Sequence, residues 1–219
     1  MSSGRTQPLL EALLAAAGMV LFALFVRSGP PWSLVSCLGL ALTALAVLLS
    51  LRRERTMAGL LGLVPFGRRA AFMGLLGIGL GLGFGLLFRW KFGLHWFPGA
   101  LGPFAPVAGA IGGVEELLYR GYVQGRLNRI NGVLGVIGAA AAHTAYKTAL
   151  FLPPVLGPSS GPPAGVDVDW RVLVFWTFSG GLIFGVLRQV ARNVAPALAA
   201  HVAFDVVVYG ELARAPWWV

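Results

Sequence analysis

The sequence predicts an all-α, polytopic membrane protein with about seven transmembrane helices. Of its 219 residues, 57% are hydrophobic and only 11% are charged, whereas soluble domains carry about 25% charged residues. The apolar residues form successive runs close to the roughly 20 residues that a membrane-spanning helix needs, and short segments rich in arginine separate them. The 31 glycines and 14 prolines fit closely packed and interrupted membrane helices.

The net charge of +9 admits two interpretations. A basic chain can bind nucleic acid, but here the basic residues are dispersed between apolar runs and form no single basic face. We therefore expect them to orient the chain in a lipid bilayer, with no nucleic-acid partner. The single cysteine excludes an intramolecular disulfide and a cysteine-based zinc cluster.

The predicted spans are apolar segments bounded by basic or turn-forming residues. By its length the first span suits a signal peptide, but the residues from Phe25 to Pro30 contain no small-x-small cleavage site, so we expect a retained helix. In chain order the spans are Leu9–Val26, Trp32–Leu51, Ala70–Phe88, Pro103–Tyr122, Val133–Leu152, Val172–Val190 and Val194–Tyr209.

The third span carries a repeated glycine pattern. Gly77, Gly81 and Gly85 recur at four-residue spacing, and such a face lets another helix approach closely. A dinucleotide-binding loop is the alternative, but neither a strand nor a downstream acidic residue accompanies these glycines. The pattern therefore predicts helix packing.

The basic residues also predict the orientation. With a cytosolic N-terminus, ten basic residues outside or at the ends of the spans lie in the cytosol and five on the other side, which satisfies the positive-inside rule. The cytosolic ten are Arg5, Arg52, Arg53, Arg55, Arg68, Arg69, Arg126, Arg129, Arg188 and Arg192, and the other five are Arg27, Arg89, Lys91, Arg171 and Arg214.

The fourth span contains the strongest candidate site, the segment Gly112-Gly113-Val114-Glu115-Glu116-Leu117-Leu118-Tyr119-Arg120. Ionisable groups in a membrane span cost roughly 2.5–3.5 kcal/mol each on insertion scales, so they usually mark function. Glu116 and Arg120 have the i,i+4 spacing of an ion pair. Successive helical residues point about 100° apart, so Glu115 faces another neighbour, without a local counter-charge. Such a carboxylate is suited to act as a general base.

Two later spans bring further polar groups to a similar depth. Glu115 is expected about 10–15 Å, His143 about 15 Å and His201 about 10 Å from the cytosolic ends of their helices. Asp205 lies one turn after His201 on the same helix face. We therefore expect the side chains of Glu115, His143 and His201 to converge.

Several functions are compatible with this convergence. In one interpretation Glu115 activates water, and the histidines and Asp205 position it and stabilise an oxyanion. In another, Glu115, His143, His201 and Asp205 bind a zinc-like metal that activates the water, although no H-E-x-x-H pair is present. A structural polar network and a proton-coupled transport path are further alternatives. Transport is disfavoured because the chain lacks paired halves.

The motif E-E-x-x-x-R at Glu115–Arg120, the histidine His143 on the next helix, and H-x-x-x-D at His201–Asp205 resemble the CPBP family. These are the CAAX-protease and bacteriocin-processing intramembrane endopeptidases, which include the Ras-converting enzyme. The resemblance covers about residues 103–209. It implies N-terminal transmembrane helices and connectors over residues 1–102, a catalytic helical core over 103–209 and a C-terminal tail over 210–219, within one integral membrane domain.

The resemblance also implies residue roles. Glu115 becomes the water-activating base, Glu116 and Arg120 the supporting pair, and His143 and His201 catalytic or oxyanion-side groups. Asp205 takes the place that asparagine usually holds, which weakens a pure oxyanion role and favours metal binding. The family's second motif is F-x-x-x-H, but Ala139 stands where the aromatic residue is expected, so aromatic support should be missing. Lys147 is expected either to offset the charge of Asp205 or to extend to an interface.

Taken together, these features predict an intramembrane endopeptidase that cleaves a peptide bond of a membrane-associated peptide or protein. Prenylated C-terminal motifs, bacteriocin-like leaders and C-terminal sorting tags are the candidate substrates. No cofactor is expected, with zinc as the alternative, and a bacterial or archaeal plasma membrane is the expected location. A non-proteolytic immunity or scaffold protein that keeps the fold is the alternative function.

Overall fold

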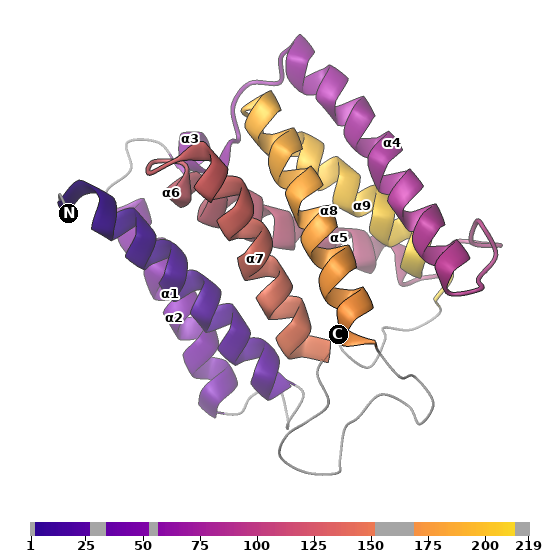
Figure 1. Ribbon diagram of the computed structural model, residues 1–219, viewed down its shortest axis with the longest axis horizontal. Coiled ribbons are helices and arrows are strands. Elements are labelled where there is room, and N and C mark those ends of the chain that lie inside the picture. The colour runs from indigo at the N-terminus through magenta and orange to yellow at the C-terminus, as the bar shows by residue number, and fades with distance from the viewer. Residues whose placement is uncertain (1–2, 27–33, 53–56, 152–168, 213–219) are drawn as a thin grey trace.

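The computed structural model describes residues 3–26, 34–52, 57–151 and 169–212, and within these ranges all regular structure is helical (Figure 1). The elements are α1 (Ser3–Val26), α2 (Leu34–Leu51), α3 (Met57–Leu61), α4 (Arg68–Lys91), α5 (Ala105–Glu116), η1 (Leu117–Val123), α6 (Gln124–Leu127), α7 (Gly132–Phe151), α8 (Trp170–Ala191) and α9 (Ala195–Tyr209).

Hydropathy supports the membrane assignment. Among the described residues, three segments are long and apolar enough to cross a membrane: Thr6–Phe25 in α1, all of α4 and all of α8. Shorter apolar helices cover Leu38–Ser50 and Ala195–Tyr209. The predicted class, an all-α polytopic membrane protein, is confirmed, whereas the count of seven spans and the cytosolic N-terminus stay predictions.

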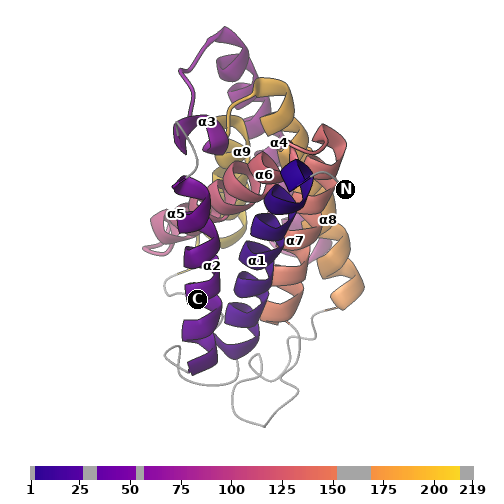
Figure 2. The ribbon, with the colours of Figure 1, turned by 90° about the vertical axis from the view of Figure 1, so that its left-hand side faces the viewer.

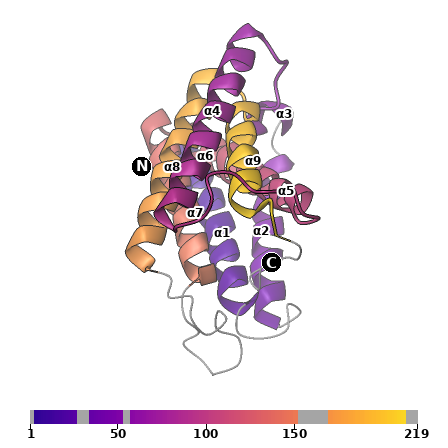
Figure 3. The same ribbon diagram turned by 90° about the vertical axis from the view of Figure 1, so that its right-hand side faces the viewer.

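The long helices pack in pairs, and neighbouring pairs lie side by side. The helices α1 and α2 form a hairpin (Figure 2), α7 lies against both α1 and α8, and α4 packs along α9 (Figure 3). The helix α5 contacts α9, and η1 contacts α7. The helices α5, α7 and α9, which carry the candidate residues, therefore meet inside the bundle.

The glycine face of α4 packs as predicted, because it receives α9. A Cβ atom added at Gly77 would lie 2.5 Å from the carbonyl oxygen of Pro196, and one at Gly81 would collide with the backbone of Ala200. Two aligned glycines thus let the α9 backbone approach α4, which fixes the helix that carries His201.

The fourth predicted span, Pro103–Tyr122, differs from its expected form. The chain is helical from Ala105 to Leu127, but the seven residues of η1 form a π-helix between two α-helical pieces. Figure 1 shows α5 and α6 crossing the direction of α7 and α8. Isolated π-turns inside α-helices are rare and occur frequently at functional sites, and this one begins directly after Glu116.

Asparagine caps set the starting points of two site helices. The side-chain oxygen of Asn131 accepts hydrogen bonds from the amides of Val133 (2.8 Å) and Leu134 (3.2 Å) at the start of α7. The corresponding oxygen of Asn193 accepts one from the amide of Ala195 (2.8 Å) at the start of α9. Such caps satisfy amides that lack an intrahelical partner, so they fix the register of both helices.

Candidate active site

Glu116 occupies the centre of the buried polar residues. Its Oε1 atom accepts a hydrogen bond from Arg120 Nη1 at 2.8 Å, and both side chains are completely buried. This is the i,i+4 contact that the spacing predicts. The same oxygen lies 2.8 Å from His201 Nδ1, so Glu116 joins η1 to α9.

Glu115 is held by residues of α7. Its Oε2 atom lies 3.0 Å from His143 Nε2, and its Oε1 atom accepts a hydrogen bond from Lys147 Nζ at 2.6 Å. The prediction that Glu115 lacks a counter-charge is therefore wrong. His143 and Lys147 are four residues apart on one face of α7, so a helix that brings His143 to Glu115 brings Lys147 as well. That spacing was the signal that could have identified the pair.

The two histidines complete the contacts. His143 Nδ1 lies 3.1 Å from Arg120 Nη1, and His201 Nε2 lies 3.8 Å from Glu115 Oε2 and 3.7 Å from Asp205 Oδ2. The structure thus brings together all six residues predicted for the site, namely Glu115, Glu116, Arg120, His143, His201 and Asp205, and adds Lys147. We call these seven residues the Glu–His cluster.

The neighbours of each imidazole determine its hydrogen-bonding roles. A guanidinium only donates, so His143 Nδ1 accepts from Arg120, and Nε2 carries the proton that it donates to Glu115. A carboxylate accepts, so His201 Nδ1 donates to Glu116. The Nε2 atom of His201 is left facing Glu115 and Asp205.

Aromatic rings pack around the histidines, contrary to the expectation drawn from Ala139. The ring of Tyr119 lies 4.7 Å from that of His143, and Tyr146 stacks on His143 with centroids 6.5 Å apart. On the other side, Phe184 lies 5.4 Å from the ring of His201. The support comes from other positions, and Tyr119 could have been found because it follows Glu115 by four residues.

Close packing of α5 on α9 depends on Gly112. A Cβ atom at this position would lie 3.2 Å from His201 Cδ2 and would overlap Asp205 Oδ2. The absence of a side chain therefore allows His201 and Asp205 to lie directly against the backbone of α5.

The contacts of the cluster bear on the zinc alternative. Nowhere in the described ranges do three His, Cys, Asp or Glu side chains form a group that could hold a metal. Zinc ligands need unshared electron pairs about 2.0–2.2 Å from the ion. Lys147 and Arg120 occupy Glu115 Oε1 and His143 Nδ1, whereas Glu115 Oε2 lies near His143 Nε2 and His201 Nε2. Metal dependence therefore stays a prediction.

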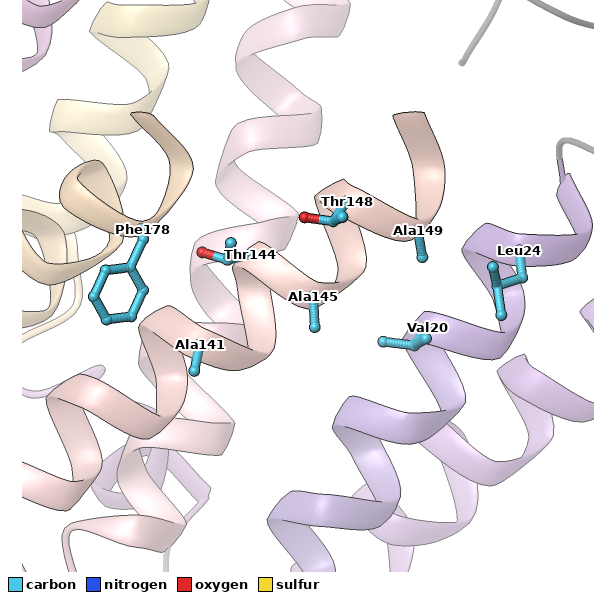
Figure 4. Close-up of a pocket in the computed structure, with 8 residues that line it drawn as sticks. All are labelled: Val20, Leu24, Ala141, Thr144, Ala145, Thr148, Ala149 and Phe178. Atoms are coloured by element: carbon cyan, nitrogen blue, oxygen red, sulfur yellow. The ribbon is translucent and has the colours of Figure 1, made fainter. Parts of the chain in front are cut away.

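A separate apolar pocket opens between α1, α7 and α8 (Figure 4). Its volume is about 530 Å³, and none of the seven cluster residues lines it. The lining residues are Val20, Leu24, Ala141, Thr144, Ala145, Thr148, Ala149 and Phe178.

This all-helical bundle has helices long and apolar enough to cross a membrane and buries paired glutamates, an arginine and two histidines, side chains that can serve hydrolysis within a membrane. The sequence matches the model of the type II CAAX prenyl endopeptidase Rce1-like family over residues 95–207, more than half of the chain. The chain belongs to this family and is therefore a CAAX-type intramembrane protease. No curated protein and no solved structure matches the sequence.

The matched range contains all the predicted site residues, and α1, α2 and α4 precede it. The individual catalytic roles, and the predicted division at residues 102 and 209, stay predictions.

Proposed function

We propose that this protein hydrolyses a peptide bond of a membrane-associated substrate with a water molecule activated by Glu115, without a metal ion. The observation that carries the proposal is the contact between Glu115 Oε2 and His143 Nε2 at 3.0 Å. Arg120 orients this imidazole by donating a hydrogen bond to its other nitrogen, Nδ1. A carboxylate oriented in this way can accept a proton from water as water attacks the carbonyl carbon.

Glu116 and Arg120 act as positioning residues. Both are completely buried, so they do not touch the substrate. Arg120 orients His143, and Glu116 orients His201. A single ion pair thus sets the directions of both imidazoles.

His201 is assigned to the oxyanion that forms on the carbonyl oxygen. Its Nδ1 proton is committed to Glu116, so a proton on Nε2 would be the donor to the oxyanion. Asp205, 3.7 Å from that nitrogen, favours a proton there. Asp205 therefore supports an oxyanion role through His201, in contrast to the sequence-based expectation.

The name of the family indicates the substrate class. We propose a peptide that carries a prenylated cysteine close to its C-terminus, held in the bilayer by its lipid, in a bacterial or archaeal plasma membrane. Bacteriocin-like leaders and C-terminal sorting tags are the other substrates to be assayed.

The test is hydrolysis of an S-farnesylated CAAX peptide by the purified protein in liposomes. Glu115→Gln keeps the shape of the side chain but removes its basicity, so activity should fall by at least about 100-fold. Asp169→Asn is the matched control, because Asp169 is exposed and caps the start of α8 away from the cluster, and asparagine can keep that cap. Equal activity of Glu115→Gln and the wild type would contradict the general-base role. If the wild type cleaved none of the three substrate classes, the scaffold alternative would be favoured.

A second measurement addresses the metal. Asp205→Asn should retain or increase activity, because the amide no longer favours a proton on His201 Nε2 but can itself donate to the oxyanion, and a chelator should have no effect. About one zinc per chain, lost together with activity in Asp205→Asn, would contradict the metal-free proposal.

A further inference from the structure

Lys147 differs from the other charged members of the Glu–His cluster in its exposure. Its side chain is 19% exposed, whereas that of Arg120 is completely buried and that of Glu115 is 6% exposed. Its ammonium group lies 5.6 Å from the centroid of the Tyr146 ring. Of the two cations in the cluster, Lys147 is therefore the one whose side chain has exposed surface.

The contacts of Glu115 show why access to Lys147 matters. Its Oε1 atom is bound by Lys147 and its Oε2 atom faces His143. A water molecule that gives its proton to Glu115 needs a lone pair on one of these oxygens, and the ammonium group at 2.6 Å competes for those of Oε1. The buried Arg120 holds His143 in place, so the contact with Lys147 is the one that can be exchanged.

Separating a buried ammonium group from its counter-ion requires another anion to take the place of that counter-ion. Breaking one partner from a buried ion pair is strongly unfavourable, because the remaining charge is uncompensated. Another anion must therefore take the place of Glu115 beside Lys147. In a peptide substrate the available anion is a carboxylate.

We propose that Lys147 binds a carboxylate of the substrate. When the ammonium group of Lys147 moves from Glu115 to this carboxylate, Oε1 of Glu115 becomes free to accept a proton from the attacking water. Lys147 is then a specificity-determining residue that couples substrate recognition to release of the base. This inference rests on the proposed function for the role of Glu115. Recognition of the carboxylate can also be measured by binding alone.

The carboxylate has two sources, the C-terminus of the peptide or an acidic side chain. Three fluorescent probes distinguish them, each with S-farnesylcysteine followed by three residues. The first ends in a free acid, the second is the same peptide as its C-terminal amide, and the third is an amide whose last residue is aspartate.

Binding is measured in the Glu115→Gln background, where no turnover is expected and Lys147 has lost its ionic partner. In this background the free acid should bind at least about tenfold more tightly than the amide. This acid-to-amide ratio of affinities should be larger than the ratio measured for the wild type. In Glu115→Gln/Lys147→Met the ratio should fall to about one. That double variant removes both charges of the pair, so it leaves no unpaired carboxylate to disturb folding.

Lys91 supplies the control, since it is the other lysine of the sequence and lies exposed at the end of α4. Lys91→Met in the Glu115→Gln background should keep the acid-to-amide ratio. Tight binding of the aspartate probe that also depends on Lys147 would identify the acidic side chain as the source.

The inference would be overturned if, in Glu115→Gln, neither carboxylate-bearing probe bound more tightly than the plain amide. It would also be overturned if such a preference persisted after Lys147→Met was added. Different results would contradict the proposed function and the role of Lys147. If the Lys147-dependent preference is present but wild-type protein does not hydrolyse the acid, the carboxylate site stands and the hydrolytic mechanism falls. If hydrolysis proceeds with no preference, the mechanism stands and the role of Lys147 falls.

Discussion

The helical segment from Ala105 to Leu127 joins two buried ionic clusters, and they are built differently. The first is the Glu–His cluster at α5 and η1. The second, the Glu11 cluster, comprises Glu11, Ser50, Tyr122 and Arg126. In it Glu11 Oε2 accepts a hydrogen bond from Ser50 at 2.8 Å and lies 3.0 Å from Arg126 Nε. The hydroxyl of Tyr122 donates to the carbonyl oxygen of Ala46 at 2.7 Å.

The two carboxylates differ in the chemistry of their partners. Glu11 faces a guanidinium, which keeps its protons, and hydroxyl groups that fix its geometry. Glu115 instead faces an imidazole and the ammonium group of a lysine whose side chain is partly exposed. The first arrangement ties α1 and α2 to α6. Under the proposed function, the second is the one that exchanges a proton and a partner.

Glu116→Gln gives the largest stability effect, and it tests whether one glutamate of the Glu–His cluster behaves like Glu11. The change leaves Arg120 buried without its carboxylate, so the free energy of unfolding should fall by about 3–5 kcal/mol. Reversible unfolding in detergent, compared with Glu115→Gln, provides the measurement. An unfolding free energy equal to that of the wild type would remove the distinction between the two glutamates.

Gly81→Ala displaces the helix that supplies His201 without changing the Glu11 cluster. The added methyl group collides with the backbone of Ala200, and such overpacking costs about 1–3 kcal/mol. We expect lower activity together with lower stability. Gly83→Ala is the matched control, since nothing lies within 4 Å of its Cβ position. If both substitutions had the same effect, the close approach of α4 to α9 would not matter to the site.

The smallest effect is expected for the coupling between Glu11 and Arg126. A double-mutant cycle with Glu11→Gln and Arg126→Met should give a coupling free energy of about 0.5–3 kcal/mol in unfolding. The turnover of the folded protein should change little, because this cluster links α1 and α2 to α6 and contains none of the proposed catalytic residues. A loss of turnover as large as that of Glu115→Gln would show that both clusters take part in the reaction.

Several features were predictable because they depend on spacing within one helix. The contact of Glu116 with Arg120 follows from i,i+4 geometry, and the glycine face of α4 follows from its four-residue repeat. Composition was sufficient for the all-α membrane class. The meeting of Glu115, His143 and His201 required one further step, the comparison of their depths in three helices.

Other features depend on how helices rotate against one another, which spacing does not encode. The π-helix after Glu116 has no recognisable pattern in Leu117–Val123. The partner of Glu115 was sought on its own helix, whereas Lys147 comes from α7. Likewise, Tyr119 packs on His143 from η1, although the family motif places the aromatic residue at position 139, on α7 itself.

The close fit at Gly112 links the evolution of two positions that are distant in sequence. A methyl group at residue 112 would occupy space now filled by Asp205 Oδ2 and would press on the ring of His201. Asparagine, which has nearly the same volume as aspartate, would meet the same obstruction. The space at Gly112 therefore does not distinguish aspartate from asparagine at position 205. A lineage can acquire a side chain at position 112 only after position 205 has become smaller or has turned away.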